Sequence, residues 1–248
     1  LPRVMSSIGN PIVLSGYIVL CIPLVLYIRK TQKNKLLWNF ITLIHIVCIL
    51  FTFSRSTIAI LGVVCIFFIL KTEKINSIIK SLFLVLFISL LFYFILDSYG
   101  LSQSLIDRLL FRTGSASFDI RNQAYDIAFN VWSHSNLLFG LGKVSFGDYL
   151  VNTLSFNNGT LENVFLTLLV GTGLGGLISF LFILLALFRS FSKMEYSLKV
   201  TGYSILIVFI LLSTFISALP YDCLWGVFWY FTGLILLHTK KLTPSNEV

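Results

Sequence analysis

Three arginines and one glutamate are the side chains best suited to chemistry: Arg3, Arg55, Arg121 and Glu162. Guanidinium groups donate paired hydrogen bonds that match phosphate oxygens, so the arginines could hold an anionic ligand. Arg55 is the only charged residue in the mostly apolar stretch 36–70. An arginine within a membrane is costly unless it faces water, a partner or an anion. The sequence therefore predicts at Arg55 either an anion site or a hairpin tip in the headgroup layer.

Glu162 follows a polar approach and precedes a long apolar run. One interpretation is structural: a carboxylate in a first helical turn is favoured by the helix dipole, with Thr160 or Asn158 as the cap. The other is chemical, because a partly buried carboxylate can act as a general base that takes a proton. The residue types alone do not separate these two interpretations.

The elements that must position these residues are membrane helices. The chain is 57% hydrophobic and only 11% charged, against about 25% charged residues in soluble domains. A membrane crossing needs about 20 apolar residues. We expect an all-α, polytopic membrane protein with about seven transmembrane helices in a single domain, residues 1–248. The expected helices cover residues 12–28, 36–53, 56–70, 78–96, 161–188, 200–219 and 222–238.

Basic residues orient these helices, because positively charged loops stay in the cytoplasm. Seven crossings place four basic clusters on one side and leave Arg3, Arg55 and Arg121 on the other, together with a large loop over residues 97–160. We therefore expect a multi-pass protein of the cytoplasmic membrane with its chemistry facing outward. The four clusters are Arg29, Lys30, Lys33 and Lys35; Lys71, Lys74 and Lys80; Arg189, Lys193 and Lys199; and Lys240 and Lys241.

The start of the chain predicts a fragment. Leu1 stands where an intact chain would have Met, and residues 1–11 lack the pattern of a signal peptide. We therefore expect the sequence to be the C-terminal part of a longer protein.

The large loop contains one pattern of helical spacing. It predicts an amphipathic helix at the membrane surface, capped by Ser117 and ending at Trp132, a residue suited to the interface. Gly140, Gly142 and Gly147 then interrupt regular structure. The apolar positions of this helix are Ile120, Ala124, Ile127, Ala128 and Val131.

Other patterns favour ordinary packing. Gly171, Gly173 and Gly176 have dinucleotide-binding spacing, but no strand precedes them, so helix packing through Gly171 and Gly175 is the better interpretation. No metal or other cofactor is expected, because His45 and His134 each lack partners at useful spacing. The basic residues form no single soluble patch, so no nucleic-acid partner is expected.

Several short motifs, in order, resemble a known family. GNPIVLSGY follows Arg3, Ser54-Arg55-Ser56 lies at the expected hairpin, and the loop carries RNQAYDIAFNVW and then LFGLG. ENVFLTLLVGTGLGG, which begins with Glu162 and Asn163, opens the next helix. Together these motifs are similar to those of the bacterial O-antigen ligase and polymerase superfamily, over residues 1 to about 190.

The resemblance implies a membrane-embedded glycosyltransferase of GT-C-like architecture that needs no metal. Its substrates would be an undecaprenyl-diphosphate-linked oligosaccharide donor and acceptor within membrane lipid, with a chain-length regulator as a candidate protein partner. It assigns the diphosphate to Arg55, Arg121 and Arg3, and proton removal to Glu162. Asn163, Ser54 and Trp132 would support the site.

The same resemblance favours one branch of the superfamily. Ligases have a His-Asn pair where this chain has Glu162-Asn163. We therefore expect a repeat-unit polymerase for O-antigen or capsule, with ligase-like transfer to another acceptor as the alternative. A transporter for an anionic substrate is a further hypothesis, although charged residues are nearly absent from the expected crossings. A seven-helix receptor is a third hypothesis, supported only by the helix count.

Overall fold

The computed structural model describes residues 11–52, 54–72, 94, 97–98, 115–142, 163–215 and 222–242. Over these residues the protein is all-helical, as the composition predicts, with one isolated bridge between Asn136 and Gly140. The helices are α1 (Pro11–Thr31), α2 (Lys35–Phe51), α3 (Arg55–Thr72), α6 (Ser115–His134), α8 (Val164–Ser192), α9 (Tyr196–Phe215) and α10 (Asp222–Leu242).

These helices match six of the seven expected apolar runs and the amphipathic loop helix. The remaining run, 78–96, lies outside the described residues except for Phe94. Among the described helices, α1, α8 and α9 are long and apolar enough to cross a membrane, and α2, α3 and α10 contain shorter apolar stretches. The protein is therefore a membrane protein by these criteria, and the count of seven crossings stays a prediction.

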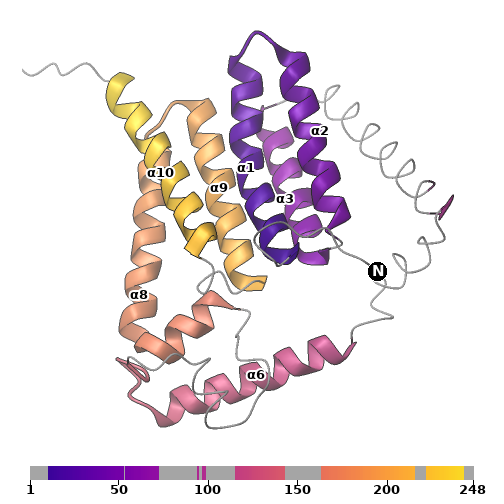
Figure 1. Ribbon diagram of the computed structural model, residues 1–248. Coiled ribbons are helices and arrows are strands. Elements are labelled where there is room, and N and C mark those ends of the chain that lie inside the picture. Colours follow the sequence, from indigo (N-terminus) through magenta and orange to yellow (C-terminus); the bar gives the residue numbers. More distant parts are fainter. Residues whose placement is uncertain are drawn as a thin grey trace, which may run out of the picture. The chain divides into compact units, whose positions relative to one another are not determined.

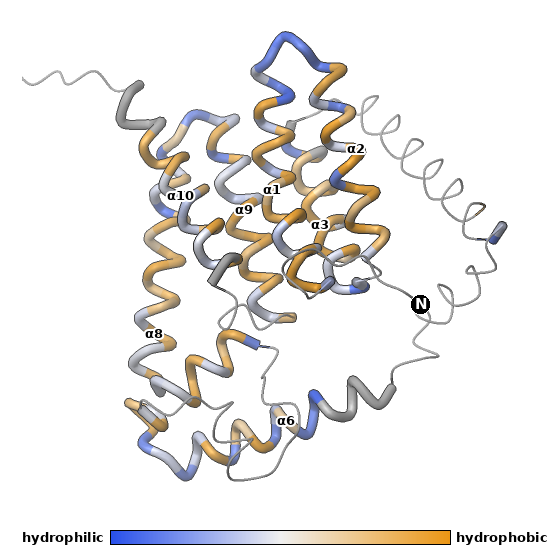
Figure 2. Tube along the Cα trace, viewed as in Figure 1, coloured by the Kyte–Doolittle hydropathy of each residue, from blue (hydrophilic) through white to orange (hydrophobic). Residues whose placement is uncertain are grey.

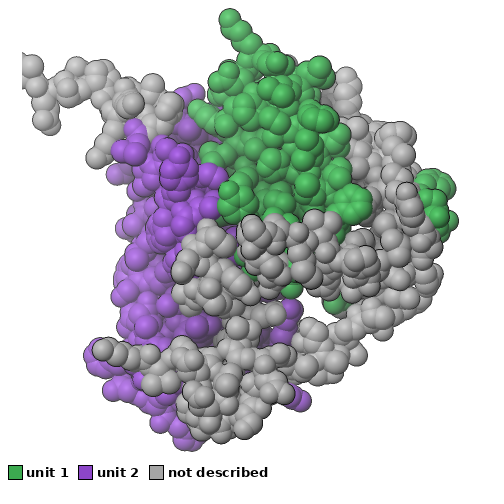
Figure 3. All heavy atoms as spheres, in the orientation of Figure 1, with its two compact units in different colours: residues 1–118 green, residues 119–248 purple. Residues whose placement is uncertain are grey.

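The chain divides into two compact units, residues 1–118 and 119–248 (Figure 3). In unit 1, α1 packs against both α2 and α3 (Figure 1). Large apolar side chains fill the centre of this packing, while others on α2 and α3 remain exposed, as expected where lipid takes the place of water. The buried side chains include Val19, Leu20 and Ile22 of α1, Ile49 of α2, and Ile60 and Val64 of α3.

The reversal between α2 and α3 falls where the sequence predicts it. α2 ends at Phe51 and α3 begins at Arg55. The turn is tied to α1 by a buried hydroxyl pair, in which Thr57 Oγ1 lies 2.9 Å from Ser15 Oγ and 3.1 Å from the Ser54 carbonyl. Ser15 and Thr57 are fully buried. Their hydrogen bond therefore fixes the position of the hairpin tip along α1, which non-directional apolar contacts would define less sharply.

A double-mutant cycle tests this attachment. We expect Ser15→Ala and Thr57→Val to be coupled by about 1 kcal/mol of unfolding free energy, the net value of one intramolecular hydrogen bond. The measurement is unfolding of the purified protein in detergent for the two single variants, the double variant and the parent. Strictly additive effects would contradict the hydroxyl pair.

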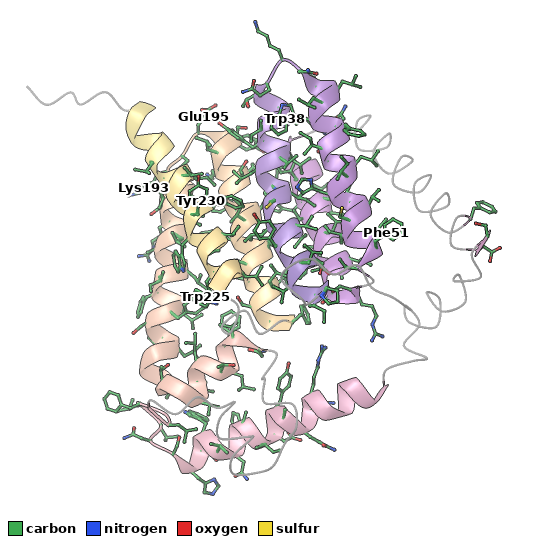
Figure 4. All side chains as sticks on the ribbon, in the orientation of Figure 1. Trp38, Phe51, Lys193, Glu195, Trp225 and Tyr230 are labelled. Carbon is green, nitrogen blue, oxygen red and sulfur yellow. The ribbon has the colours of Figure 1, made fainter. Side chains whose placement is uncertain are left out.

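Unit 2 contains α9 packed against both α8 and α10. Aromatic rings fill the contacts: Phe209 stacks on Phe228 at a centroid distance of 3.7 Å and meets Trp225 edge-on at 5.4 Å. At the other end of α9, Gly202 leaves room for the ring of Phe191, which is fully buried. Figure 4 shows Trp225 at the opposite end of this bundle from Lys193 and Glu195, which lie at the α8–α9 turn.

α8 is broken at Gly173, where φ is 67° and ψ is −166°. The break separates a first segment, residues 164–172, from a second, residues 174–192. It folds the first segment back, because the ring centroids of Phe165 and Phe180 lie only 6.0 Å apart, whereas 15 residues of straight helix would span about 22 Å. The second segment is still about 28 Å long, close to the thickness of a bilayer core.

The loop after α6 closes this break. We call residues 136–142 the docking loop, and it lies at the kink of α8 in Figure 1. Four backbone N–H groups donate across the contact, two from the loop and two from the second segment. They run from Leu141 to the Val170 carbonyl, Gly142 to Gly171, Leu174 to Leu137 and Gly175 to Leu138, at 2.8, 3.0, 2.9 and 3.0 Å.

Two glycines make this contact possible. Gly140 and Gly173 both have positive φ, a conformation that costs other residues roughly 1–2 kcal/mol. A Cβ on Gly173 would overlap the backbone of Leu138, and one on Gly140 would overlap that of Val170. The expected helix packing through Gly171 and Gly175 is therefore only partly right, because a Cβ on Gly175 would approach the Leu138 carbonyl but one on Gly171 would meet nothing.

Alanine substitution at the glycines tests the docking. We expect Gly173→Ala and Gly140→Ala each to lower the unfolding midpoint by at least about 2 °C, the smallest shift that roughly 1–2 kcal/mol causes in a chain of this size. Gly171→Ala is the matched control, since its Cβ would enter open space within the same helix. Thermal unfolding followed by tryptophan fluorescence measures all three. Equal losses for Gly171→Ala and Gly173→Ala would show that the docking geometry is wrong.

Candidate functional site

α6 carries Arg121 on its buried face. Ala124, Tyr125 and Ala128 follow Arg121 at the three-, four- and seven-residue spacing of one helix face. Ala124 and Ala128 are buried, whereas Arg121 and Tyr125 are half-buried. Arg121 therefore lies on the same face of α6 as the two buried alanines.

The partner of this face is α8. Ala124, Ala128 and Val170 form one apolar cluster, and Leu141 and Leu166 pack against it. The amphipathic helix is thus confirmed, but it runs from Ser115 to His134, so the expected cap at Ser117 and end at Trp132 are wrong. Its apolar side is covered by the first segment of α8 and by the docking loop. Figure 2 shows the contrast in composition, with α6 alternating between hydrophilic and hydrophobic residues and α8 predominantly hydrophobic.

Trp132 links α6 to the docking loop. Its indole Nε1 donates to the Leu137 carbonyl at 3.4 Å, and its ring meets that of Phe129 edge-on at 5.3 Å. The loop itself is shaped by Asn136, whose Oδ1 accepts from the backbone N–H groups of Leu138 and Phe139 at 3.0 and 3.2 Å. Trp132 therefore has a structural role in holding the docking loop, in addition to any contact with a ligand.

Asn163 caps α8. Its Oδ1 accepts from the Leu166 backbone N–H at 3.0 Å, and its carbonyl accepts from Thr167. The expectation that Thr160 or Asn158 caps this helix is therefore wrong. Glu162 lies outside the described residues, so both the structural and the chemical role considered for it stay predictions.

Arg55 and Ser54 lie in unit 1, at the α2–α3 reversal. Ser54 is buried, and its Oγ lies 3.4 Å from the Ser56 hydroxyl. Arg55 is half-buried and is the first residue of α3. A positive side chain at a helix N-terminus opposes the helix dipole by roughly 0.3–1 kcal/mol. The choice between an anion site and a structural arginine at this position therefore stays open.

The predicted site residues divide into three groups. Arg121, Trp132 and Asn163 belong to unit 2 and flank one packed cluster, since Arg121 lies one turn before Ala124 and Asn163 lies three residues before Leu166. Arg55 and Ser54 belong to unit 1. Arg3 and Glu162 lie outside the described residues, and the roles of all the candidate residues in binding or catalysis stay predictions.

Sequence reasoning missed the docking loop. Asn136, Gly140 and Gly173 determine how α6 meets α8. The sequence indicated Gly140 only as a break in regular structure and Gly173 only as part of a glycine motif, and it gave no role to Asn136. One signal was present: residues 161–188 form an apolar run longer than the roughly 20 residues of a crossing, with glycines near its start. Excess length together with glycine indicates a break in a membrane helix.

Comparison with known proteins identifies the family. The sequence profile described as O-antigen ligase matches residues 40–181. The matched region runs from α2 past the kink of α8, so it contains Ser54, Arg55, Arg121, Trp132, Glu162 and Asn163 but not Arg3. A comparison with curated proteins finds no match. Because the profile covers more than half of the chain, this protein belongs to the O-antigen ligase family.

Proposed function

We propose that the protein is a glycosyltransferase that polymerises undecaprenyl-diphosphate-linked oligosaccharide repeats into O-antigen or capsule, on the outer side of the cytoplasmic membrane. Members of its family are glycosyltransferase-like enzymes of polysaccharide synthesis. The observation that carries the proposal is that one family match includes Arg55, Arg121 and the Glu162-Asn163 pair.

The proposed reaction moves a glycan from its diphosphate to an acceptor hydroxyl. Glu162 takes the hydroxyl proton while the acceptor oxygen attacks the anomeric carbon. The bond from this carbon to the diphosphate oxygen breaks, and undecaprenyl diphosphate departs with the bonding electrons. Arg55 and Arg121, with Arg3 as a third candidate, stabilise the charge that develops on the leaving group.

Arginine could make this chemistry independent of metal. Metal-dependent transferases often bind a divalent ion to the diphosphate with an Asp-x-Asp motif, and this chain has none. Guanidinium groups supply positive charge and directed hydrogen bonds to the same oxygens. We therefore propose that the donor diphosphate is held by arginine alone.

The choice between polymerase and ligase concerns the acceptor. The Glu162-Asn163 sequence departs from the His-Asn pair of the ligase branch and favours a polymerase. The family profile is described as O-antigen ligase, which favours transfer to another acceptor as the second candidate. Both reactions consume the same donor and release the same lipid diphosphate.

Reconstitution separates these outcomes. The purified protein would be placed in lipid vesicles with one undecaprenyl-diphosphate-linked repeat and excess chelator, and the products analysed by mass spectrometry. A polymerase gives lipid-linked products that grow by whole repeats, with release of undecaprenyl diphosphate. Donor consumption only when a lipid A core acceptor is added would establish a ligase, and no consumption under either condition would overturn the glycosyltransferase proposal.

Substitutions at the charged residues test the site. We expect Arg55→Ala, Arg121→Ala and Glu162→Gln each to reduce long-chain polysaccharide at least about tenfold, since hydrogen bonds to charged groups contribute roughly 1.5–3 kcal/mol. Gel analysis of surface polysaccharide measures the effect at matched membrane levels of protein. Arg189→Ala is the control, because Arg189 is an exposed arginine in the last turn of α8. Normal chains in all three site variants would disprove the assignment.

Asn163 is expected to act by positioning. Asp retains the cap and Ala removes it, which costs about 1 kcal/mol. We therefore expect Asn163→Asp to keep the unfolding midpoint and the polysaccharide length distribution, and Asn163→Ala to lower the midpoint and shorten the chains. If Asn163→Asp abolished polymer while the midpoint stayed normal, the amide itself would contact substrate.

A further inference from the structure

The tip of the docking loop exposes three large apolar side chains. The exposed fractions of Leu137, Leu138 and Phe139 are 49%, 58% and 70%. Residues 135–142 contain no charged side chain. Phe129, on the last turns of α6 and in contact with Trp132, is also exposed at 57%. These leucine and phenylalanine side chains form one exposed apolar patch on the loop and the adjoining helix end. Contact between such a patch and water is unfavourable, so the patch indicates an apolar partner.

This patch is held rigidly against a helix that is long enough to cross the membrane. The carbonyls of Leu137 and Leu138 accept from the backbone N–H groups of Leu174 and Gly175. Leu174 is the first residue of the second segment of α8, residues 174–192. The loop tip therefore lies at the same depth as the beginning of this segment.

The length of the second segment fixes that depth. Arg189 and Lys193 mark the other membrane boundary, where long basic side chains extend to the headgroups. From Leu174 to Arg189 the helix rises about 22 Å, and to Lys193 about 28 Å. Since the hydrocarbon core is about 30 Å thick, Leu174 and the loop tip bonded to it fall at or within the opposite edge of the hydrocarbon.

We infer that Leu137, Leu138 and Phe139 insert into the acyl chains of the leaflet nearest the kink of α8, and thereby anchor the end of α6 at the membrane surface. The occupant is bilayer lipid. The loop tip is uncharged, and it joins the exposed apolar side chains of α8 itself, such as Ile178, Leu181 and Phe182. Trp132, whose indole donates to the loop, has the amphipathic character that favours the interface.

This inference goes beyond glycosyl transfer and does not depend on it. It assigns a lipid contact to a segment that the sequence places in a large loop outside the membrane. It also fixes the height of the C-terminal end of α6, because that end is held by the inserted loop.

Spin labelling measures the depth directly. In a variant with Cys21, Cys48, Cys65 and Cys223 replaced by Ala, single Cys substitutions at Leu138 and Phe139 would carry a nitroxide. The full protein would be reconstituted in vesicles of phosphatidylethanolamine and phosphatidylglycerol. Collision with oxygen, which concentrates in hydrocarbon, would be compared with collision with a water-soluble nickel chelate. Gln123→Cys, on an exposed position of α6, is the aqueous control, and Phe182→Cys, on an exposed position of α8, is the hydrocarbon control.

We expect oxygen collisions to exceed nickel collisions at Leu138, Phe139 and Phe182, most strongly at the deeper Phe182, and the ratio to be reversed at Gln123. Nickel collisions at Leu138 and Phe139 equal to those at Gln123 would show that the tip is in water. Low collision rates with both reagents would show that the tip is buried in protein, either in this chain or in a second copy. Either result would overturn the lipid anchor.

Discussion

A helix inside a membrane cannot be broken unless other groups bond to the backbone at the break. In water an interrupted helix leaves N–H and C=O groups that solvent can satisfy, but in hydrocarbon each unsatisfied group costs several kcal/mol. α8 is interrupted at Gly173, and the docking loop supplies two N–H groups and two carbonyls that satisfy both sides of the interruption. This reciprocal bonding lets the first segment fold back, and it ties the end of α6 to the start of a membrane span.

The arrangement of unit 2 follows from this pairing. With the first segment of α8 folded back, Val170 and Leu166 can cover the small residues Ala124 and Ala128 on α6. Arg121 and Asn163 then flank the same cluster from two different helices. In unit 1, a single buried hydrogen bond has a similar role. The hydroxyls of Ser15 and Thr57 fix the hairpin that carries Arg55. In both units, polar bonds hold the elements that bear the candidate arginines, and apolar packing fills the remainder.

The sequence predicts the helices because insertion of a helix into lipid depends on its hydrophobicity, and long apolar runs can be recognised directly in the sequence. It also locates the α2–α3 reversal at Arg55, since a single charge within residues 36–70 is too costly to leave in mid-membrane. The break at Gly173 is harder to predict from the sequence, because it depends on backbone partners from a loop that lies more than 30 residues earlier in the chain. Asn163 as the cap was missed for a similar reason: several polar residues precede α8, and only the backbone conformation selects one of them. Of the candidate site, Arg3 and Glu162 rest on sequence motifs alone.

The reciprocal bonding between the docking loop and α8 is the central structural claim, and hydrogen exchange at single amides measures it most directly. In the full protein in lipid nanodiscs, the amide protons of Leu141 and Gly142 should exchange as slowly as those within the second segment of α8, because both donate to α8 carbonyls. The amides of Leu174 and Gly175 should be protected to the same degree. Exchange of the Leu141 and Gly142 amides at the rate of an unstructured peptide, in protein whose helices remain protected, would contradict the account.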